Sequence, residues 1–146
     1  MDAHKAHILI VEDNPDDEAL LMRQLNKAGL GQHVKVIDDG KVAIDFLTGP
    51  DAPIGELIAV FLDLRLPHMS GLQVLEKIRA NDRTKNLPVI VMTSSNAPTD
   101  LEKCKKLGVS CYVQKPVTFT TFTKAVADSF HVPSTATGPM PTKLNE

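Results

Sequence analysis

The sequence lacks a long hydrophobic run, and its longest uninterrupted apolar segment is the six residues 57–62. A membrane-spanning helix needs roughly 20 predominantly apolar residues, so we expect no membrane span. The N-terminal segment MDAHKAH leads into only four apolar residues, too few for the core of a signal peptide. We therefore expect a soluble chain that stays in the cytoplasm.

The sequence also has few cysteines and a small net charge. The two cysteines, Cys104 and Cys111, do not form a CxxC pair, and we expect both to be reduced thiols. A formal net charge of −2 provides no broad basic surface, so we expect no nucleic-acid partner. The five histidines are scattered without metal-ligand spacing. Gly29-Leu-Gly31 lacks the third glycine of a dinucleotide-binding loop and is interpreted as a turn.

Short apolar segments alternate with amphipathic ones along the chain. The apolar segments are predicted strands at 7–11, 34–37, 57–62, 88–92 and 109–113. The first, third and fourth are nearly continuous in hydrophobicity, which is typical of parallel strands covered on both faces. Helical periodicity and capping residues predict helices at 15–28, 41–48, 71–80, 98–107 and 118–130. This alternation predicts an α/β fold, a doubly wound sandwich with a five-stranded parallel sheet and helices on both faces.

The aromatic row of the last predicted helix, Phe119, Phe122 and Phe130, is interpreted as core, with an interface as the alternative for part of it. Periodicity is lost after Val132, where the Pro- and Thr-rich segment PSTATGPMPTKLNE begins. We expect residues 1–132 to form one domain and residues 133–146 to form a tail without an output domain.

Polar side chains follow the predicted strands. Glu12 and Asp13 follow the first strand, Asp63 the third, Thr93 the fourth and Lys115 the fifth. Ligands of open parallel sheets bind outside the carboxyl ends of the strands, near the point where the strand order reverses. We therefore expect these side chains to meet at one site.

Three clustered acids call for a cation, because two carboxylates ~4 Å apart repel by roughly 4 kcal/mol at an effective dielectric of 20. With no nearby His or Cys, Mg²⁺ or Mn²⁺ is the predicted ion. A lysine and a hydroxyl opposite the acids suit a phosphoryl group, which makes Asp63 a candidate nucleophile forming an acyl phosphate. Asp16 and Asp17 have a structural explanation as first-turn helix acids and are left out of this predicted site.

Four segments carry a resemblance to a known family: ILIVEDN at 8–14, FLDLRLPHMSG at 61–71, PVIVMTSS at 88–95 and YVQKP at 112–116. Together they resemble response regulator receiver domains, the phosphoacceptor family paired with histidine kinases. The resemblance spans residues 7–130 and implies a (βα)5 flavodoxin-like fold. The segments VMTSS, GVSCYVQKPV and TFTTF look like stand-alone regulators partnered with bacterial phytochrome-like kinases.

The resemblance implies a metal-assisted acceptor. Asp63 would be the phosphoacceptor and a ligand of Mg²⁺, for which Mn²⁺ can substitute. Asp13 would bind the ion directly, Glu12 through a water, and Arg65 through its backbone carbonyl. Glu12 stands where the family more often has Asp.

The resemblance also implies a switch. Thr93 and Lys115 would hold phosphoryl oxygens, and Tyr112 would change rotamer when Thr93 moves. The Lys115–Pro116 peptide bond would be cis, which aims the lysine inward.

The implied partners are a sensor histidine kinase and either a downstream protein or a histidine phosphotransfer protein. The chain would be a switch that catalyses only its own phosphotransfer and autodephosphorylation. In such regulators the face of the fourth helix, fifth strand and fifth helix often mediates dimers, so we expect a homodimer, to which the tail could contribute.

Three other kinds of protein share some of these features. A haloacid-dehalogenase-type phosphatase also uses an Asp nucleophile, but it places a second acid two residues later, where this chain has Arg65. A degenerate, binding-only receiver would normally have lost Asp63 or Lys115. A flavodoxin-like cofactor-binding protein would need a phosphate loop, and nothing in the sequence resembles one.

Overall fold

Each predicted apolar segment forms a strand of one parallel sheet in the computed structural model, which describes residues 7–94 and 96–129. The strand order is β2-β1-β3-β4-β5, and all four neighbouring pairs are parallel. The strands are β1 (Ile8–Val11), β2 (Val34–Ile37), β3 (Ala59–Asp63), β4 (Val89–Thr93) and β5 (Cys111–Gln114). The order reverses at β1, so the carboxyl ends of β1 and β3 flank the point where such folds bind ligands.

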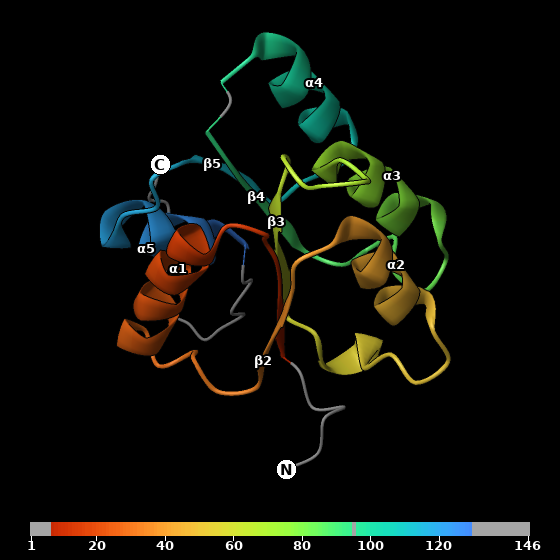
Figure 1. Ribbon diagram of the computed structural model, residues 1–146, viewed down its shortest axis with the longest axis horizontal. Coiled ribbons are helices and arrows are strands. Elements are labelled where there is room, and N and C mark those ends of the chain that lie inside the picture. The colour runs from red at the N-terminus through yellow and green to blue at the C-terminus, as the bar shows by residue number, and fades with distance from the viewer. Residues whose placement is uncertain (1–6, 95, 130–146) are drawn as a thin grey trace.

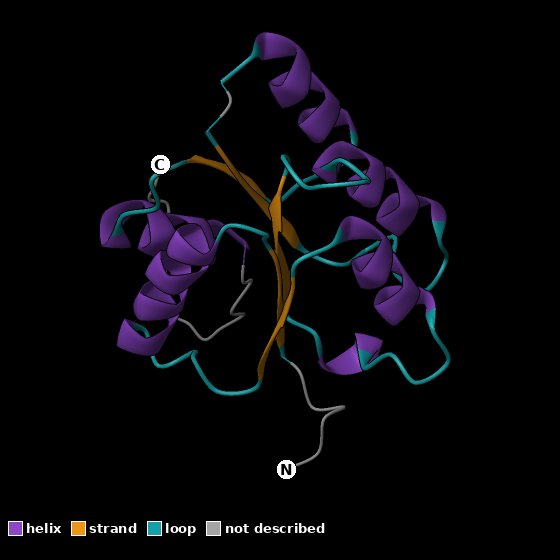
Figure 2. Ribbon diagram, viewed as in Figure 1, coloured by secondary structure: helices purple, strands orange, loops and turns teal. Residues whose placement is uncertain are grey.

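The helices cover both faces of this sheet. They are α1 (Pro15–Lys27), α2 (Gly40–Thr48), α3 (Gly71–Ala80), α4 (Pro98–Lys106) and α5 (Phe119–Ser129). Figure 1 shows α1 and α5 on one side of the sheet and α2, α3 and α4 on the other, and Figure 2 separates the central strands from the surrounding helices. The predicted doubly wound (βα)5 flavodoxin-like sandwich is therefore confirmed.

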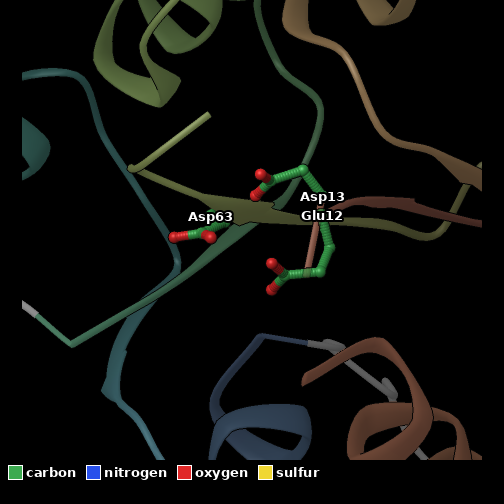
Figure 3. A group of neighbouring side chains, drawn as sticks. All are labelled: Glu12, Asp13 and Asp63. Atoms are coloured by element: carbon green, nitrogen blue, oxygen red, sulfur yellow. The ribbon is translucent and has the colours of Figure 1, made fainter. Parts of the chain in front are cut away.

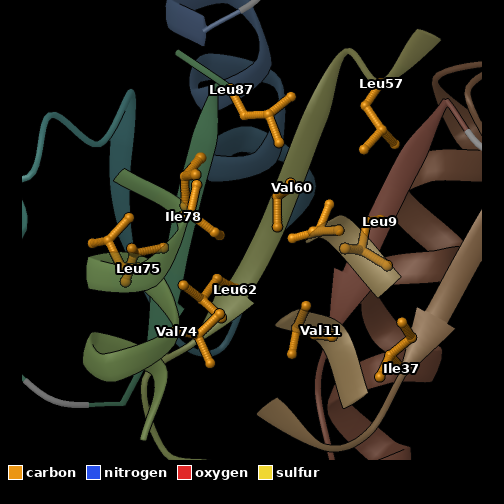
Figure 4. Close-up of a cluster of buried hydrophobic side chains, with 14 of the residues drawn as sticks. Leu9, Val11, Ile37, Leu57, Val60, Leu62, Val74, Leu75, Ile78 and Leu87 are labelled. Atoms are coloured by element: carbon orange, nitrogen blue, oxygen red, sulfur yellow. The ribbon is translucent and has the colours of Figure 1, made fainter. Parts of the chain in front are cut away.

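Alternation along the strands builds a core on each face. In β1, Leu9 and Val11 pack with α2 and α3, whereas Ile8 and Ile10 pack with α1 and α5. Part of the first cluster is drawn in Figure 4. Because both faces are covered, every β1 side chain is buried, and this explains the continuous hydrophobicity of the segment.

The third strand begins and ends later than predicted. A short 3-10 helix, η1 (Ile54–Glu56), lies in the preceding loop, and the strand starts only at Ala59. Asp63 is the last residue of β3 and lies 4% exposed, rather than beyond the strand in water. Thr93 likewise ends β4 and is fully buried. Hydrophobicity alone could not separate the strand from the apolar residues leading into it.

Within the predicted aromatic row, the core interpretation does not hold for Phe119. It is 37% exposed at the start of α5, where the ammonium group of Lys27 lies 4.6 Å from its ring centroid. Phe122, one turn later, is buried and stacks on Phe61 at a centroid distance of 6.0 Å. Phe130 lies outside the described residues.

Three further predictions concern the cysteines, membrane-spanning helices and the C-terminal tail. Cys104 is buried and Cys111 is half-buried, and no disulfide joins these two cysteines. No helix in the described ranges is both long and apolar enough to cross a membrane. The predicted tail, residues 133–146, lies outside the described part of the chain.

Candidate functional site

Three carboxylates meet at the carboxyl ends of β1 and β3. Glu12 follows β1, where its backbone N–H donates to the carbonyl of Ile37 at 3.0 Å, and the residue is 1% exposed. Asp13 is exposed, and Asp63 ends β3. One oxygen of each carboxylate lies within 4.8 Å of the others, and Figure 3 shows the three side chains at the strand ends. The predicted acidic cluster is therefore present.

Two backbone N–H groups of the segment after β3 fix the positions of Asp63 and its neighbour Leu64. The backbone N–H of Arg65 donates to Asp63 Oδ1 at 3.1 Å, and the N–H of Gly71 donates to the carbonyl of Leu64 at 2.9 Å. A Cβ atom at Gly71 would collide with the backbone carbonyl of Asp63. Glycine at this position thus lets α3 begin directly against the end of β3.

Lys115 places its ammonium group among the acids. Its Nζ lies 2.8 Å from Glu12 Oε1, 3.1 Å from Asp63 Oδ2 and 2.7 Å from Asp17 Oδ2. The Lys115–Pro116 peptide bond is cis, as the family resemblance implied. Burial by itself would lower the pKa of Lys115, but the hydrogen bonds to Asp17 and Glu12 and the charge of Asp63 raise the pKa above its ordinary value. The lysine is therefore a permanent cation in this site.

Asp17 belongs to this group, although the sequence analysis left it out as a first-turn helix acid. It does occupy the first turn of α1, where its backbone N–H donates to the Asn14 side chain at 3.1 Å. Its carboxylate also makes the shortest of the three contacts to Lys115. One signal was available in the sequence: α1 starts only two residues after Asp13, so its first turn must lie beside the carboxyl end of β1.

Burial raises the pKa of Glu12 to about 7, against the lowering effect of its hydrogen bond to Lys115 and of the backbone N–H of Asn14. The charge of Asp63 adds to the rise. Both oxygens of Glu12 are engaged, since Oε2 accepts from the Asn14 N–H at 3.1 Å and Oε1 from Lys115. Glu12 therefore binds a proton more tightly than an ordinary glutamate does.

The predicted hydroxyl residue, Thr93, ends β4, and the predicted aromatic residue, Tyr112, is the second residue of β5. Thr93 is fully buried, and its carbonyl accepts from the backbone N–H of Lys115 at 2.8 Å. Ser94, the next residue, is exposed and lines the site. Tyr112 is half-buried and packs against the core on the α2–α4 side of the sheet.

An open pocket of about 600 Å³ lies at this end of the sheet, and Glu12, Thr93 and Tyr112 are not among the residues that line it. Its lining consists of Asp13, Asn14, Pro15, Asp17, Asp63, Arg65, Ser94, Lys115 and Pro116. Lys115 and the carboxylates of Asp13, Asp17 and Asp63 all border this space, so charged groups of both signs are available to a small anionic ligand and its counter-ion.

The donor set fits a hard divalent cation. Glu12, Asp13 and Asp63 form the one group of three potential metal-ligating side chains found within residues 7–94 and 96–129. All three offer carboxylate oxygen, the ligand that Mg²⁺ and Mn²⁺ prefer over the nitrogen and sulfur ligands of zinc. The predicted cofactor therefore agrees with the chemistry of the site.

Known proteins resemble this chain along most of its length. The response regulator receiver domain family matches residues 8–127. The probable methanogenesis regulatory protein FilR2 of Methanothrix harundinacea is 34% identical over 124 residues, which cover 83% of this chain and 79% of FilR2.

Two solved structures share the fold. The bacteriophytochrome response regulator AtBRR is 40% identical with a TM-score of 0.72, and the match covers 95% of this chain and 96% of AtBRR. The Mn²⁺-bound form of the response regulator Rcp1 is 29% identical with a TM-score of 0.72, covering 91% of this chain and 98% of Rcp1. The bound Mn²⁺ of Rcp1 and the carboxylate cluster of this chain point to the same cofactor class.

Fold, acidic cluster and family match therefore agree. The chain belongs to the response regulator receiver domain family, whose members are metal-dependent phosphoacceptor switches rather than enzymes acting on an outside substrate.

Proposed function

We propose that this chain is a response regulator that takes a phosphoryl group from a kinase histidine onto Asp63. One observation carries the proposal: the buried Asp63 carboxylate ends β3 beside an open pocket, with Oδ1 oriented by the Arg65 N–H and Oδ2 by Lys115. A carboxylate held in this way presents its oxygens to a phosphoryl donor in one orientation.

In the reaction, an Asp63 oxygen attacks phosphorus while the bond from phosphorus to the donor histidine nitrogen breaks. The electron pair of that bond stays on the imidazole, and the product is an acyl phosphate on Asp63. Lys115 and Thr93 hold phosphoryl oxygens. Loss of the phosphoryl group to water, by attack of a water oxygen on phosphorus, regenerates Asp63 and completes autodephosphorylation.

A divalent ion supplies the positive charge that the phosphoryl oxygens need near four carboxylates. We assign Mg²⁺, with Mn²⁺ as a substitute, to Asp13 and Asp63 as direct ligands. Glu12 would act through a water, and the backbone carbonyl of Arg65 would complete the protein ligands. The closeness of the three carboxylates supports this assignment.

The proposed switch runs from Thr93 to Tyr112. Thr93 ends β4 and pairs in register with Gln114 of β5, so a shift of the β4 end bears directly on β5. Tyr112 lies two residues earlier on β5 and is only half-buried, which leaves part of its side chain at the surface. A phosphoryl group that draws Thr93 toward Asp63 would thereby alter the α4-β5-α5 face.

The proposed partners follow from the family and from the likeness to AtBRR, named as a bacteriophytochrome response regulator. We propose a phytochrome-like sensor histidine kinase as donor and a downstream protein or histidine phosphotransfer protein as receiver of the signal. The reaction is assigned to the cytoplasm, where ATP charges the kinase. We further propose that residues 1–132 are the receiver, that 133–146 are a tail, and that the α4-β5-α5 face forms a homodimer.

The test is phosphoryl incorporation from labelled acetyl phosphate, with and without Mg²⁺, in the wild type and in Asp63→Asn. We expect Mg²⁺-dependent labelling that is lost in the variant, because the acceptor oxygen is replaced by an amide of the same shape. Asp16→Asn, an exposed acid outside the pocket, serves as control and should label like the wild type. Labelling that survives in Asp63→Asn would move the acceptor to another residue.

A further inference from the structure

Two histidine side chains meet at the amino-terminal end of the sheet, opposite to the end where the carboxylates gather. His7 directly precedes β1 and His33 directly precedes β2, and the first residues of these strands, Ile8 and Val34, are paired in register. The centroids of the two imidazole rings lie 5.0 Å apart, and the ring planes are inclined by 57°. The two histidines are distant in the sequence, so no spacing along the chain predicts this pair.

Backbone contacts hold both histidines in place. The N–H of His7 donates to the carbonyl of His33 at 2.8 Å, and the carbonyl of His7 accepts from the N–H of Ile58 at 2.8 Å. His33 has a φ of 60°, in the left-handed region, which few residues other than glycine adopt and where histidine is enriched. The backbone therefore keeps the two residues side by side, and the rings need only turn about their side-chain bonds to adjust.

The two rings have the capacity and the separation to bind one metal ion. Within residues 7–94 and 96–129, no hydrogen bond or ion pair engages either imidazole. A neutral imidazole presents one nitrogen lone pair to a metal. Zn–N bonds of about 2.0–2.1 Å at a tetrahedral angle place the centroids of two ligating rings roughly 5 Å apart, which matches the separation of His7 and His33.

We propose that His7 and His33 form a binding site for a late first-row divalent ion, Zn²⁺, Cu²⁺ or Ni²⁺, separate from the acidic cluster. These ions favour imidazole nitrogen, whereas Mg²⁺ prefers oxygen ligands. His7 is exposed and His33 is half-buried, so water can reach the pair and complete the coordination shell. The ion would join the starts of β1 and β2, and it would stabilise the folded chain because the pair forms only when these strands pair.

The experiment is a Zn²⁺ titration of the full-length, tag-free chain by calorimetry, with excess Mg²⁺ present to occupy the acidic cluster. The variants are His7→Gln and His33→Asn, since asparagine tolerates the left-handed conformation of His33. We expect each variant to bind Zn²⁺ at least about tenfold more weakly than the wild type, because loss of even an outer-shell partner typically costs 10–100-fold in metal affinity. The imidazole NMR signals of the wild type, followed in the same titration, require no substitution and should change first at His7 and His33.

His68→Gln is the matched control, since His68 is another exposed histidine and its ring contacts Asp39 instead. This variant should bind Zn²⁺ like the wild type. Wild-type affinity in either His7→Gln or His33→Asn would overturn the inference, as would imidazole signals of His7 and His33 that do not respond to Zn²⁺. Binding that is lost in Asp13→Asn but kept in both histidine variants would place the ion at the acidic cluster and would also overturn it.

Discussion

At the scale of single residues, the site holds more negative charge than its one ammonium group can neutralise. Glu12, Asp13, Asp17 and Asp63 supply carboxylates, and Lys115 supplies the ammonium group that contacts three of them. Lys115 cannot neutralise them all, and burial prevents water from screening Glu12 and Asp63 fully. A divalent cation offsets this excess, so metal binding and the proposed phosphoryl transfer share one electrostatic cause.

Glu12 makes Mg²⁺ binding depend on pH. Its pKa is raised from 4.5 to about 7 by burial, so the folded protein holds this proton more tightly than the unfolded chain does. This group therefore lowers the free energy of unfolding of the metal-free protein as pH rises from 4.5 to about 7. Because Mg²⁺ favours the ionised carboxylate, we expect its affinity to be about tenfold weaker at pH ~6 than at pH ~8.

Mg²⁺ titration by calorimetry at the two pH values measures this difference. Glu12→Gln cannot be protonated and should bind Mg²⁺ with an affinity that hardly changes over the same range. A pH dependence that persists unchanged in Glu12→Gln would show that another group carries the proton.

At the scale of the elements, the junction between β3 and α3 decides where the acceptor lies. Gly71 starts α3 so close to β3 that any side chain there would meet the carbonyl of Asp63. Ser70 and Gln73 form a capping box that fixes the same helix start, because the side chain of each accepts from the backbone N–H of the other. The acceptor is therefore positioned by a backbone contact as well as by its own hydrogen bonds.

Gly71→Ala should displace the end of β3. Because the added methyl group meets backbone rather than a flexible side chain, we expect the free energy of unfolding to fall by about 1–3 kcal/mol. Phosphoryl incorporation from acetyl phosphate should fall as well. Gly55→Ala is the control, since a Cβ at Gly55 meets no atom within 4 Å. Urea unfolding of both variants gives the comparison, and equal stabilities would mean that the junction relaxes freely.

Arg79 links α3 to the segment after α4. Its guanidinium group donates to the carbonyls of Leu107, Gly108, Lys85 and Leu87 at 2.6 to 3.1 Å. The C-terminal end of α4 is thereby tied to α3, whereas no side chain caps its N-terminal end. The contacts with Leu107 and Gly108 join residues 28 and 29 positions apart in the chain, and no local pattern in the sequence predicts them.

At the scale of the whole molecule, the proposed dimer face contains a sheet edge and an exposed apolar residue. Within residues 7–94 and 96–129, β5 pairs with β4 alone, and Leu101 on α4 is 40% exposed. A stable interface buries roughly 800 Å² per partner. Both features give the α4-β5-α5 face the means to contact a second copy.

Leu101→Glu should weaken the proposed dimer, because a carboxylate would be placed in an apolar contact. Val42→Glu is the matched control, since Val42 is 53% exposed on α2, away from that face. Sedimentation velocity over a concentration series, with and without the phosphoryl analogue beryllofluoride, measures association. Only monomer in every wild-type sample would refute the homodimer.

Sequence alone predicted most of the fold, because the relevant signals are local. Alternating apolar and amphipathic segments placed all five strands and helices within a few residues of their observed bounds. The same reasoning brought Glu12, Asp13, Asp63 and Lys115 to one edge, because parallel strands end at a common edge. The errors came at the ends of segments, as at Phe119. Periodicity assigns Phe119 to one face of α5, but it does not show how far the neighbouring helix extends and therefore whether that helix covers the side chain.

Tertiary structure alone decided how the charges are shared. The sequence determined that Glu12, Asp13 and Asp63 reach the carboxyl end of the sheet, since each follows or ends a strand there. It did not determine that Lys115 bonds Asp17 as well as Glu12 and Asp63, because that contact joins residues 98 positions apart. Nor did it determine the burial that raises the pKa of Glu12. Both depend on the distance and solvent access between side chains from separate elements, and packing sets these only after the sheet has formed.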